Sequence, residues 1–167
     1  MTIYAPQNFA ELEQVIAELV AGKKAVNIQS GGTKSALGHQ TSAQDMLDVS
    51  HLSGVIDYEP EELIITAHAG TPLSEIEGLL QEKGQMLAFE PPHFDRLYDT
   101  SSTGTIGGAL MANLSGPRRL SAGAARDFLL GFQAVSGRGT SFRSGSKVVK
   151  NVTGDDLSKL LCGSFGT

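Results

Sequence analysis

Residues 30–38 combine the residue types that a chain uses to hold an anion with its own backbone. The segment is Ser-Gly-Gly-Thr-Lys-Ser-Ala-Leu-Gly and contains no acidic side chain. Glycine allows the positive φ angles and the close backbone approach that such a cradle needs, so several N–H groups can converge on one anion. The pattern therefore favours binding of a phosphate compound.

Two familiar phosphate motifs do not match this segment. A P-loop needs glycine directly before its Lys-Ser pair, where Thr33 stands, and a further glycine where Ile28 stands. The dinucleotide fingerprint G-x-G-x-x-G is matched neither here nor at 104–108. The segment is therefore either a plain turn or a phosphate site in a different fold.

Residues 103–108, Thr-Gly-Thr-Ile-Gly-Gly, are a second candidate for ligand binding. Thr105 is a suitable cap for a helix that runs to Ala112, and the free N–H groups at a helix start attract anions. Two glycine segments about 70 residues apart fit a dinucleotide better than a lone phosphate. The alternative is that these glycines only permit close packing at the helix start.

The other reactive residue types indicate no catalytic group. The four histidines have no ligand-like spacing, so we expect no metal site, and only His93 is kept as a substrate-facing candidate. Arg126 and Asp127 are expected to form a structural ion pair. Cys162 is the single cysteine, which excludes a disulfide framework, and we expect it in the core.

The elements that would position these residues follow from periodicity and capping. A helix is predicted from its cap Asn8 to a closing residue, Gly22, and a second from the cap Thr71, with Pro72 at its first position, to Gly84. Strands are predicted at 25–29, 46–49, 55–58, 63–68 and 86–89, a hairpin at 128–136 and 140–144, and a last helix at 155–162. This order predicts a mixed α+β fold.

Length and charge limit the function classes. A chain of 167 residues suits one domain, or two small lobes with a shared core. A net charge of −5 argues against a nucleic-acid partner. No apolar run approaches the roughly 20 residues that span a bilayer, and the start of the chain lacks a signal-peptide pattern. We expect a soluble, cytoplasmic protein without a membrane span.

Taken together, the segments resemble the FAD-binding domain of the vanillyl-alcohol oxidase (PCMH) type of flavoprotein, and within it the FAD-binding subunits of glycolate oxidases. The resemblance covers nearly the whole chain. It rests on six ordered motifs: Gly31-Gly32-Thr33-Lys34, Glu90-Pro91-Pro92-His93, Thr105-Ile106-Gly107-Gly108, Ser115-Gly116-Pro117-Arg118-Arg119, Val148-Val149-Lys150-Asn151-Val152-Thr153-Gly154 and Gly163-Ser164-Phe165-Gly166-Thr167. One departure is Asp155-Asp156, where the family usually has Tyr-Asp.

The resemblance implies a fold and a cofactor. It implies two α+β lobes, a small N-terminal βαβ lobe at 1–53 and a larger lobe with a mixed or antiparallel sheet at 54–167. The family also has a cap domain, which we expect to be absent from these 167 residues. It implies FAD, which we expect to be non-covalent because the glycine loop offers neither histidine nor cysteine as a tether. The implied FAD-binding residues are Gly31, Gly32, Thr33, Lys34, Ser35, Gly38, Pro91, Gly104, Thr105, Ile106, Gly107, Gly108, Asn113, Gly116, Val149, Asn151 and Val152.

The resemblance also implies a function: the FAD-binding component of a dehydrogenase that acts on a small 2-hydroxy acid such as glycolate. Its partners would be a paralogous catalytic flavin subunit and an iron–sulfur subunit, which could hold it at the periphery of the inner membrane. One alternative is a non-catalytic FAD-binding assembly module, and we expect the isolated chain to be inactive. The other is a reductase that acts on a UDP-linked enolpyruvyl sugar.

Overall fold

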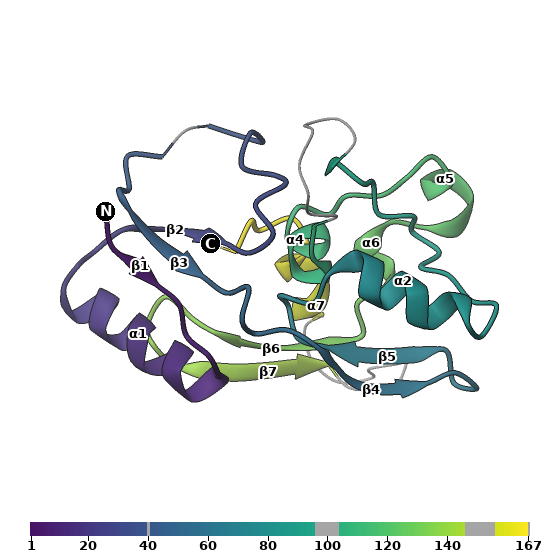
Figure 1. Ribbon diagram of the computed structural model, residues 1–167, viewed down its shortest axis with the longest axis horizontal. Helices are drawn as coiled ribbons and strands as arrows, with labels where there is room; N and C mark the ends of the chain where they lie inside the picture. Colours follow the sequence, from purple (N-terminus) through teal and green to yellow (C-terminus); the bar gives the residue numbers. More distant parts are fainter. Residues whose placement is uncertain (40, 96–103, 146–155, 167) are drawn as a thin grey trace.

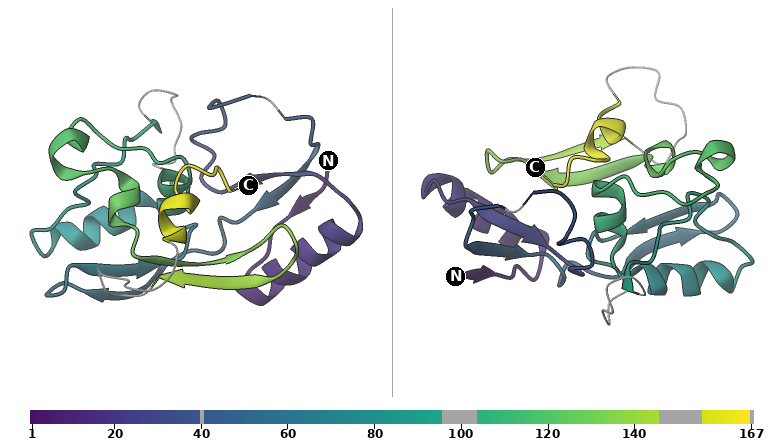
Figure 2. Two further views of the ribbon diagram at one scale, coloured as in Figure 1. Left: turned by 180° about the vertical axis from the view of Figure 1, so that it is seen from behind. Right: turned by 90° about the horizontal axis from the view of Figure 1, so that it is seen from above.

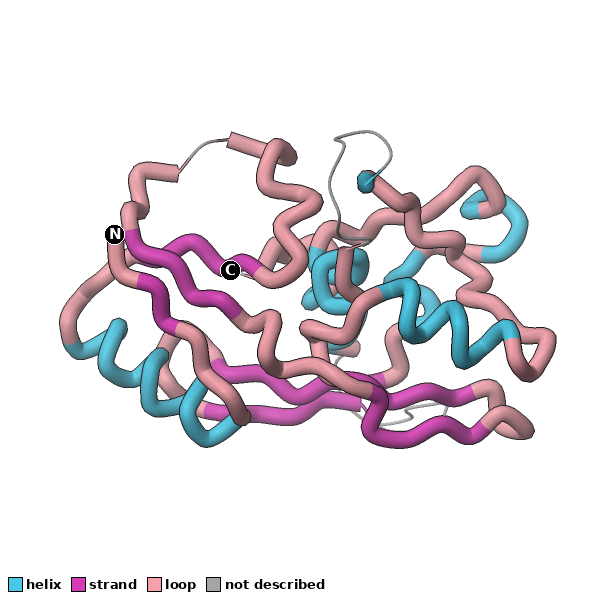
Figure 3. Tube along the Cα trace, viewed as in Figure 1, coloured by secondary structure: helices cyan, strands magenta, loops and turns pink. Residues whose placement is uncertain are grey.

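The computed structural model describes residues 1–39, 41–95, 104–145 and 156–166. In this part of the chain a three-stranded parallel sheet is followed by two antiparallel hairpins, which confirms the predicted α+β class (Figures 1 and 3). The elements are β1 (Ile3–Tyr4), α1 (Phe9–Ala21), β2 (Val26–Gln29), β3 (Asp45–Asp48), β4 (Val55–Glu59), β5 (Ile64–Ala67), α2 (Leu73–Gln81), α4 (Ile106–Met111), α5 (Arg119–Ala122), α6 (Ala125–Phe128), β6 (Gly131–Val135), β7 (Ser141–Gly145) and α7 (Leu157–Leu161).

The N-terminal sheet has the strand order β1-β3-β2, with both pairs parallel. Helix α1 connects β1 to β2, as in a βαβ unit, and its start was predicted correctly. The Asn8 side-chain oxygen accepts a hydrogen bond from the Glu11 N–H at 2.9 Å, which satisfies one of the unpaired donors of the first turn. The strand β1 was not predicted, because two residues are too few for a periodic pattern.

The end of α1 differs from the prediction by one residue. Gly22 keeps a right-handed backbone with φ −80°, and the left-handed residue that follows the helix is Lys23, with φ 48°. The Lys24 N–H donates to the Leu19 carbonyl at 2.9 Å and closes the turn. Gly22 is therefore not the reversing residue.

Helix α2 begins at Leu73, later than its predicted cap. Thr71 does not cap the helix, because its buried hydroxyl has its one proton directed to the carbonyl oxygens of His68, at 2.7 Å, or Gly54, at 3.0 Å, and accepts the Gly54 N–H. The residue in the cap position is Pro72, which makes no side-chain cap bond. Thr71 instead joins the β4–β5 hairpin to the start of α2.

The predicted strand at 86–89 does not form. These residues make a turn in which the Glu90 N–H donates to the Leu87 carbonyl at 3.0 Å, and Glu90 has a left-handed φ of 47°. The two prolines that follow have no N–H to donate to a sheet. Phe89 is still buried, so its apolar character reflects the core rather than a strand.

The late hairpin is confirmed, but its first strand begins at Gly131 rather than at residue 128. Residues 125–128 form the short helix α6, whose first turn is capped when Asp127 accepts the Ala124 N–H at 2.8 Å. Strands β6 and β7 run from α1 towards the end that holds β4, β5 and α2 (Figures 1 and 2). A methyl group at Gly139, in the hairpin turn, would lie 3.3 Å from the Ala17 Cα atom, so the turn packs directly on α1.

Most of the buried apolar side chains lie on α2 and on or next to the short helices of the second half, and Leu19 of α1 and Leu47 of β3 are buried in the N-terminal part. Leu73 and Ile76 of α2 and Ala125 of α6 are completely buried, and Ala109 of α4 is nearly so. Small side chains at these positions let the short helices approach each other closely. Cys162 lies in this region too, as predicted, and burial raises the pKa of its thiol.

Candidate functional site

The loop that follows β2 has the conformation that its glycines were expected to permit. Gly32 and Gly38 have left-handed φ angles of 70° and 83°. Within the part of the chain that the structure describes, two of the backbone N–H groups between residues 31 and 37 are bonded: Ser35 donates to the Gly32 carbonyl, and Leu37 to the Lys34 carbonyl. The Ser30 hydroxyl oxygen is buried and has no hydrogen-bond partner.

Four consecutive N–H groups of this loop therefore donate to no acceptor in the described part of the chain. They belong to Gly31, Gly32, Thr33 and Lys34. A run of unpaired N–H groups around residues of mixed handedness is the usual protein concavity for an anion. The geometry thus suits a phosphate group.

Gly104 brings the second glycine segment against this loop. A methyl group at Gly104 would lie 2.9 Å from the Thr33 hydroxyl oxygen and 3.0 Å from Lys34 Nζ. Gly104 also has a left-handed φ of 83°, so a larger residue would be strained there. The two segments that the sequence predicts to share one ligand are neighbours, with α4 beside the loop (Figure 1).

The N–H groups at the start of α4 are not free, contrary to expectation. Ile106 donates to the Thr71 carbonyl at 3.0 Å, Gly107 to the Ala69 carbonyl at 2.9 Å, and Gly108 to the Thr105 hydroxyl at 3.2 Å. The first two bonds fasten α4 to the segment before α2. Thr105 is the predicted cap, but the helix start has no spare donor at these three positions for an anion.

Lys34 supplies the positive charge at the site. Its ammonium donates to the Thr33 hydroxyl at 3.3 Å and lies 5.8 Å from the centre of the Phe94 ring. No carboxylate of the described residues lies within ion-pair distance of it. Burial is the cause that lowers its pKa. Phe94 was not singled out from the sequence, where only its position after Pro91-Pro92-His93 could have indicated it.

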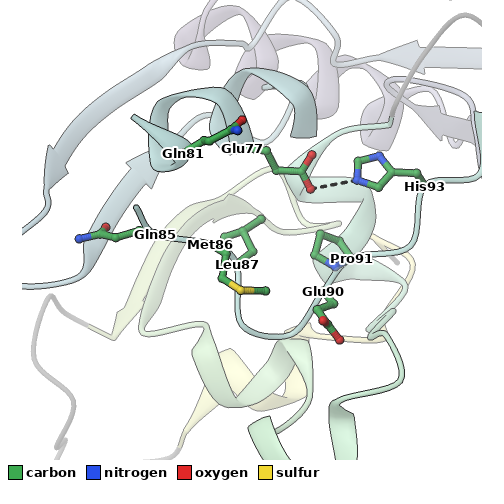
Figure 4. A pocket seen from close by; sticks show the side chains of 8 residues that line it. All are labelled: Glu77, Gln81, Gln85, Met86, Leu87, Glu90, Pro91 and His93. Carbon is green, nitrogen blue, oxygen red and sulfur yellow. Dashed lines mark hydrogen bonds and ion pairs between the residues drawn. The ribbon is translucent and has the colours of Figure 1, made fainter. Parts of the chain in front are cut away.

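His93 belongs to a separate cavity of about 370 Å³ (Figure 4). Its Nε2 atom is 2.9 Å from Glu77 Oε1 on α2, a contact that no sequence pattern signals. The cavity is lined by Glu77, Gln81, Gln85, Met86, Leu87, Glu90, Pro91 and His93. Pro91, a predicted cofactor residue, thus forms part of this wall.

The other predicted cofactor residues have packing contacts. The Asn113 side-chain oxygen accepts the Arg126 N–H at 3.3 Å, and a methyl group at Gly116 would lie 2.7 Å from the Glu90 carbonyl oxygen. Arg126 and Asp127 form the expected pair, with 3.9 Å between Nε and Oδ1. Val149, Asn151 and Val152 lie outside the described residues.

The sequence matches the FAD binding domain family over residues 2–145. The chain belongs to this family. Within the residues that the structure describes, four N–H groups of the loop have no acceptor and Lys34 has no ion-pair partner, which suits the pyrophosphate of FAD. Among the described residues, no group of three or more His, Cys, Asp or Glu side chains could hold a metal ion. No helix in that part of the chain is both long and apolar enough to cross a membrane.

Two relatives with curated names are similar to this FAD-binding domain. It is 43% identical over 157 residues to glycolate oxidase subunit GlcE of Escherichia coli strain K12, which covers 94% of this chain and 43% of that protein. It is 29% identical over 168 residues to glycolate oxidase subunit GlcD of Bacillus subtilis strain 168, which covers 99% of this chain and 34% of that protein. The chain therefore spans less than half the length of either relative.

A solved structure shows the same fold. The FAD-binding domain superimposes on an alkyldihydroxyacetonephosphate synthase with a TM-score of 0.74, covering 99% of this chain and 29% of that one at 19% identity. At this identity the likeness concerns the fold alone. It agrees with the α+β, vanillyl-alcohol oxidase type of architecture that the sequence motifs implied.

Proposed function

We propose that this chain is the FAD-binding component of a 2-hydroxy-acid dehydrogenase of the glycolate oxidase type. The observation that carries the proposal is the run of four unpaired N–H groups beside Lys34, in a chain of the FAD binding domain family. The names of the E. coli and B. subtilis relatives support the substrate class and favour it over a UDP-linked reductase. Bound FAD would accept a hydride from the α-carbon of the substrate. The hydroxyl on that carbon would lose its proton, so that the hydroxy acid becomes a 2-oxo acid.

We assign the pyrophosphate of FAD to the loop at 30–38, and the rest of the cofactor to the boundary between lobes at 1–53 and 54–167. Non-covalent binding is supported by the loop's side chains, since Thr33, Lys34 and Ser35 form no flavin tether of the histidine or cysteine kind. The proposed contacts are Gly31, Gly32, Thr33, Lys34, Ser35, Gly38, Pro91, Gly104, Thr105, Ile106, Gly107, Gly108, Asn113, Gly116, Val149, Asn151 and Val152. The packing roles of Gly107, Asn113 and Gly116 make them supports of the site.

The word "subunit" in the names of both relatives supports assembly into a complex. We propose a paralogous flavin subunit and an iron–sulfur subunit as partners, a cytoplasmic location, and attachment to the inner membrane through these partners. We assign no general base to this chain. His93, the one candidate, is engaged with Glu77 at the separate cavity.

Reconstitution with FAD tests the cofactor assignment. The chain, purified and mixed with FAD, is expected to retain a flavin absorbance spectrum after gel filtration. Acid precipitation of the loaded protein should release the flavin into the supernatant, since no covalent link holds it. A colourless protein after gel filtration would refute FAD binding, and flavin that stays with the precipitate would refute the non-covalent mode.

A dye-reduction assay tests the role in catalysis. The FAD-loaded chain alone is expected not to reduce an artificial acceptor with glycolate, whereas the assembled complex is expected to do so. Turnover by the isolated chain would contradict its assignment as a cofactor-binding component. Failure of the complex with glycolate and with other 2-hydroxy acids would contradict the substrate class.

A further inference from the structure

The positive charge that balances a bound anion at this site does not come from the start of α4. The first N–H groups of that helix are bonded to Thr71, Ala69 and Thr105. The helix is also only six residues long, so its dipole is small. Neutral N–H groups of the loop can hold a phosphate in place, but a doubly charged pyrophosphate also requires a countercharge when it leaves water.

Lys34 is the one cation that the described contacts place at this point. Its Nζ atom lies against Gly104, where a methyl group would come within 3.0 Å, and near Gly108, where one would come within 3.6 Å. Its remaining neighbours, the Thr33 hydroxyl and the Phe94 ring, are uncharged. No described element therefore neutralises the ammonium.

We propose that the Lys34 ammonium, and not the start of α4, is the countercharge for the pyrophosphate of FAD, and that it makes FAD binding pH-dependent. The proposal rests on the proposed function, because it takes FAD as the ligand. The missing side chain at Gly104 leaves room for the ammonium. Thr33 and Phe94 hold the ammonium beside the four free N–H groups of the loop, where it can meet a phosphate oxygen.

The direction of the pH dependence follows from the surroundings of Lys34. In the free chain burial lowers the pKa of this ammonium, and no carboxylate among the described residues opposes that effect. A bound pyrophosphate favours the charged form and raises the pKa again. FAD affinity is therefore greatest below the pKa of the free chain, and it falls as the pH rises above that value, where binding requires uptake of a proton.

Binding of three probes to four proteins tests the proposal. FAD, ADP and riboflavin are titrated into the wild-type chain, Lys34→Gln, Lys34→Arg and the control Lys83→Gln, which changes an exposed lysine. Lys34→Gln should weaken FAD and ADP by roughly tenfold to a hundredfold and leave riboflavin unchanged, because riboflavin has no phosphate. Lys34→Arg should recover most of the affinity, and Lys83→Gln should match the wild type.

Each outcome decides a different point. If the wild type binds no FAD, the proposed function fails and this inference fails with it. If the wild type binds FAD and Lys34→Gln binds it within about twofold, the Lys34 role is refuted and the function stands. If Lys34→Gln lost as much affinity for riboflavin as for FAD, Lys34 would have only a structural role. If Lys34→Gln does not fold, the wild-type titration with pH decides, since an affinity that stays constant into the alkaline range overturns the proposal.

Discussion

Gly104 packs so closely on Thr33 that a methyl group at residue 104 would lie 2.9 Å from the Thr33 hydroxyl oxygen. The two residues are about 70 positions apart in the sequence, and their contact joins the loop after β2 to the segment before α4. The same approach places Lys34 Nζ next to Gly104. The packing of this one glycine thus controls the shape of the candidate site.

Gly104→Ala should destabilise the chain by about 1–3 kcal/mol, because alanine disfavours the left-handed backbone and its methyl group would press on Thr33. Urea unfolding measures the change, and FAD titration should show weaker binding. Gly78→Ala is the matched control: Gly78 lies inside α2 with open space around it, so alanine there should stabilise by about 0.5–1 kcal/mol. Similar losses for both variants would contradict the packing argument.

Gly107→Ala should also destabilise the chain by about 1–3 kcal/mol, for a reason unrelated to the cofactor. Its methyl group would lie 2.6 Å from the Ala69 carbonyl oxygen, which is backbone that cannot move freely. Gly108→Ala, one residue further, has its nearest contact at 3.3 Å and should change the unfolding free energy by less than about 1 kcal/mol. Thermal unfolding without FAD separates the two, and an unaffected Gly107→Ala would argue that this glycine serves the ligand.

Asn8→Ala should lower the unfolding free energy by about 1 kcal/mol, because the Glu11 N–H loses its acceptor at the start of α1. Asn8→Ser keeps a capping oxygen and should retain most of the stability. Chemical denaturation of both variants measures the difference. A loss in the serine variant as large as that in the alanine variant would contradict the capping role.

Lys34→Met should stabilise the free chain at neutral pH, because it removes an ammonium whose burial has no compensating carboxylate in the described part of the chain. The pKa of Lys34 is lower in the folded than in the unfolded chain. Between those two pKa values the unfolded state binds more protons, so wild-type stability rises with pH and the advantage of the variant shrinks. Urea midpoints over the alkaline range test this.

The control for that comparison is Lys83→Met, which changes an exposed lysine. Its difference from the wild type should not vary with pH. If the stability difference between Lys34→Met and the wild type were also independent of pH, burial would not affect the charge of Lys34.

Capping and the spacing of apolar residues predicted the helices and strands that depend on neighbouring residues in the sequence. The cap at Asn8 and the apolar spacing after it placed α1, and alternation placed β4 and β5 within about one residue. The predicted strand at 86–89 failed because the chain turns between Leu87 and Glu90, and because its one buried residue, Phe89, packs against Phe128 of α6 rather than against a neighbouring strand. The helices α5 and α6 have four residues each, too few for a periodic signal.

The sequence alone determined that residues 30–38 would form a glycine-rich loop without acidic side chains, and its ordered motifs indicated the FAD-binding family. Both follow from residue types and order. Only the tertiary structure decided which N–H groups are free. The start of α4 looks equally suitable from its composition, but the carbonyls of Ala69 and Thr71 occupy its donors. Packing of one segment on another assigns these bonds, so in the described part of the chain the free donors and the unpaired charge lie together at Gly31 to Lys34.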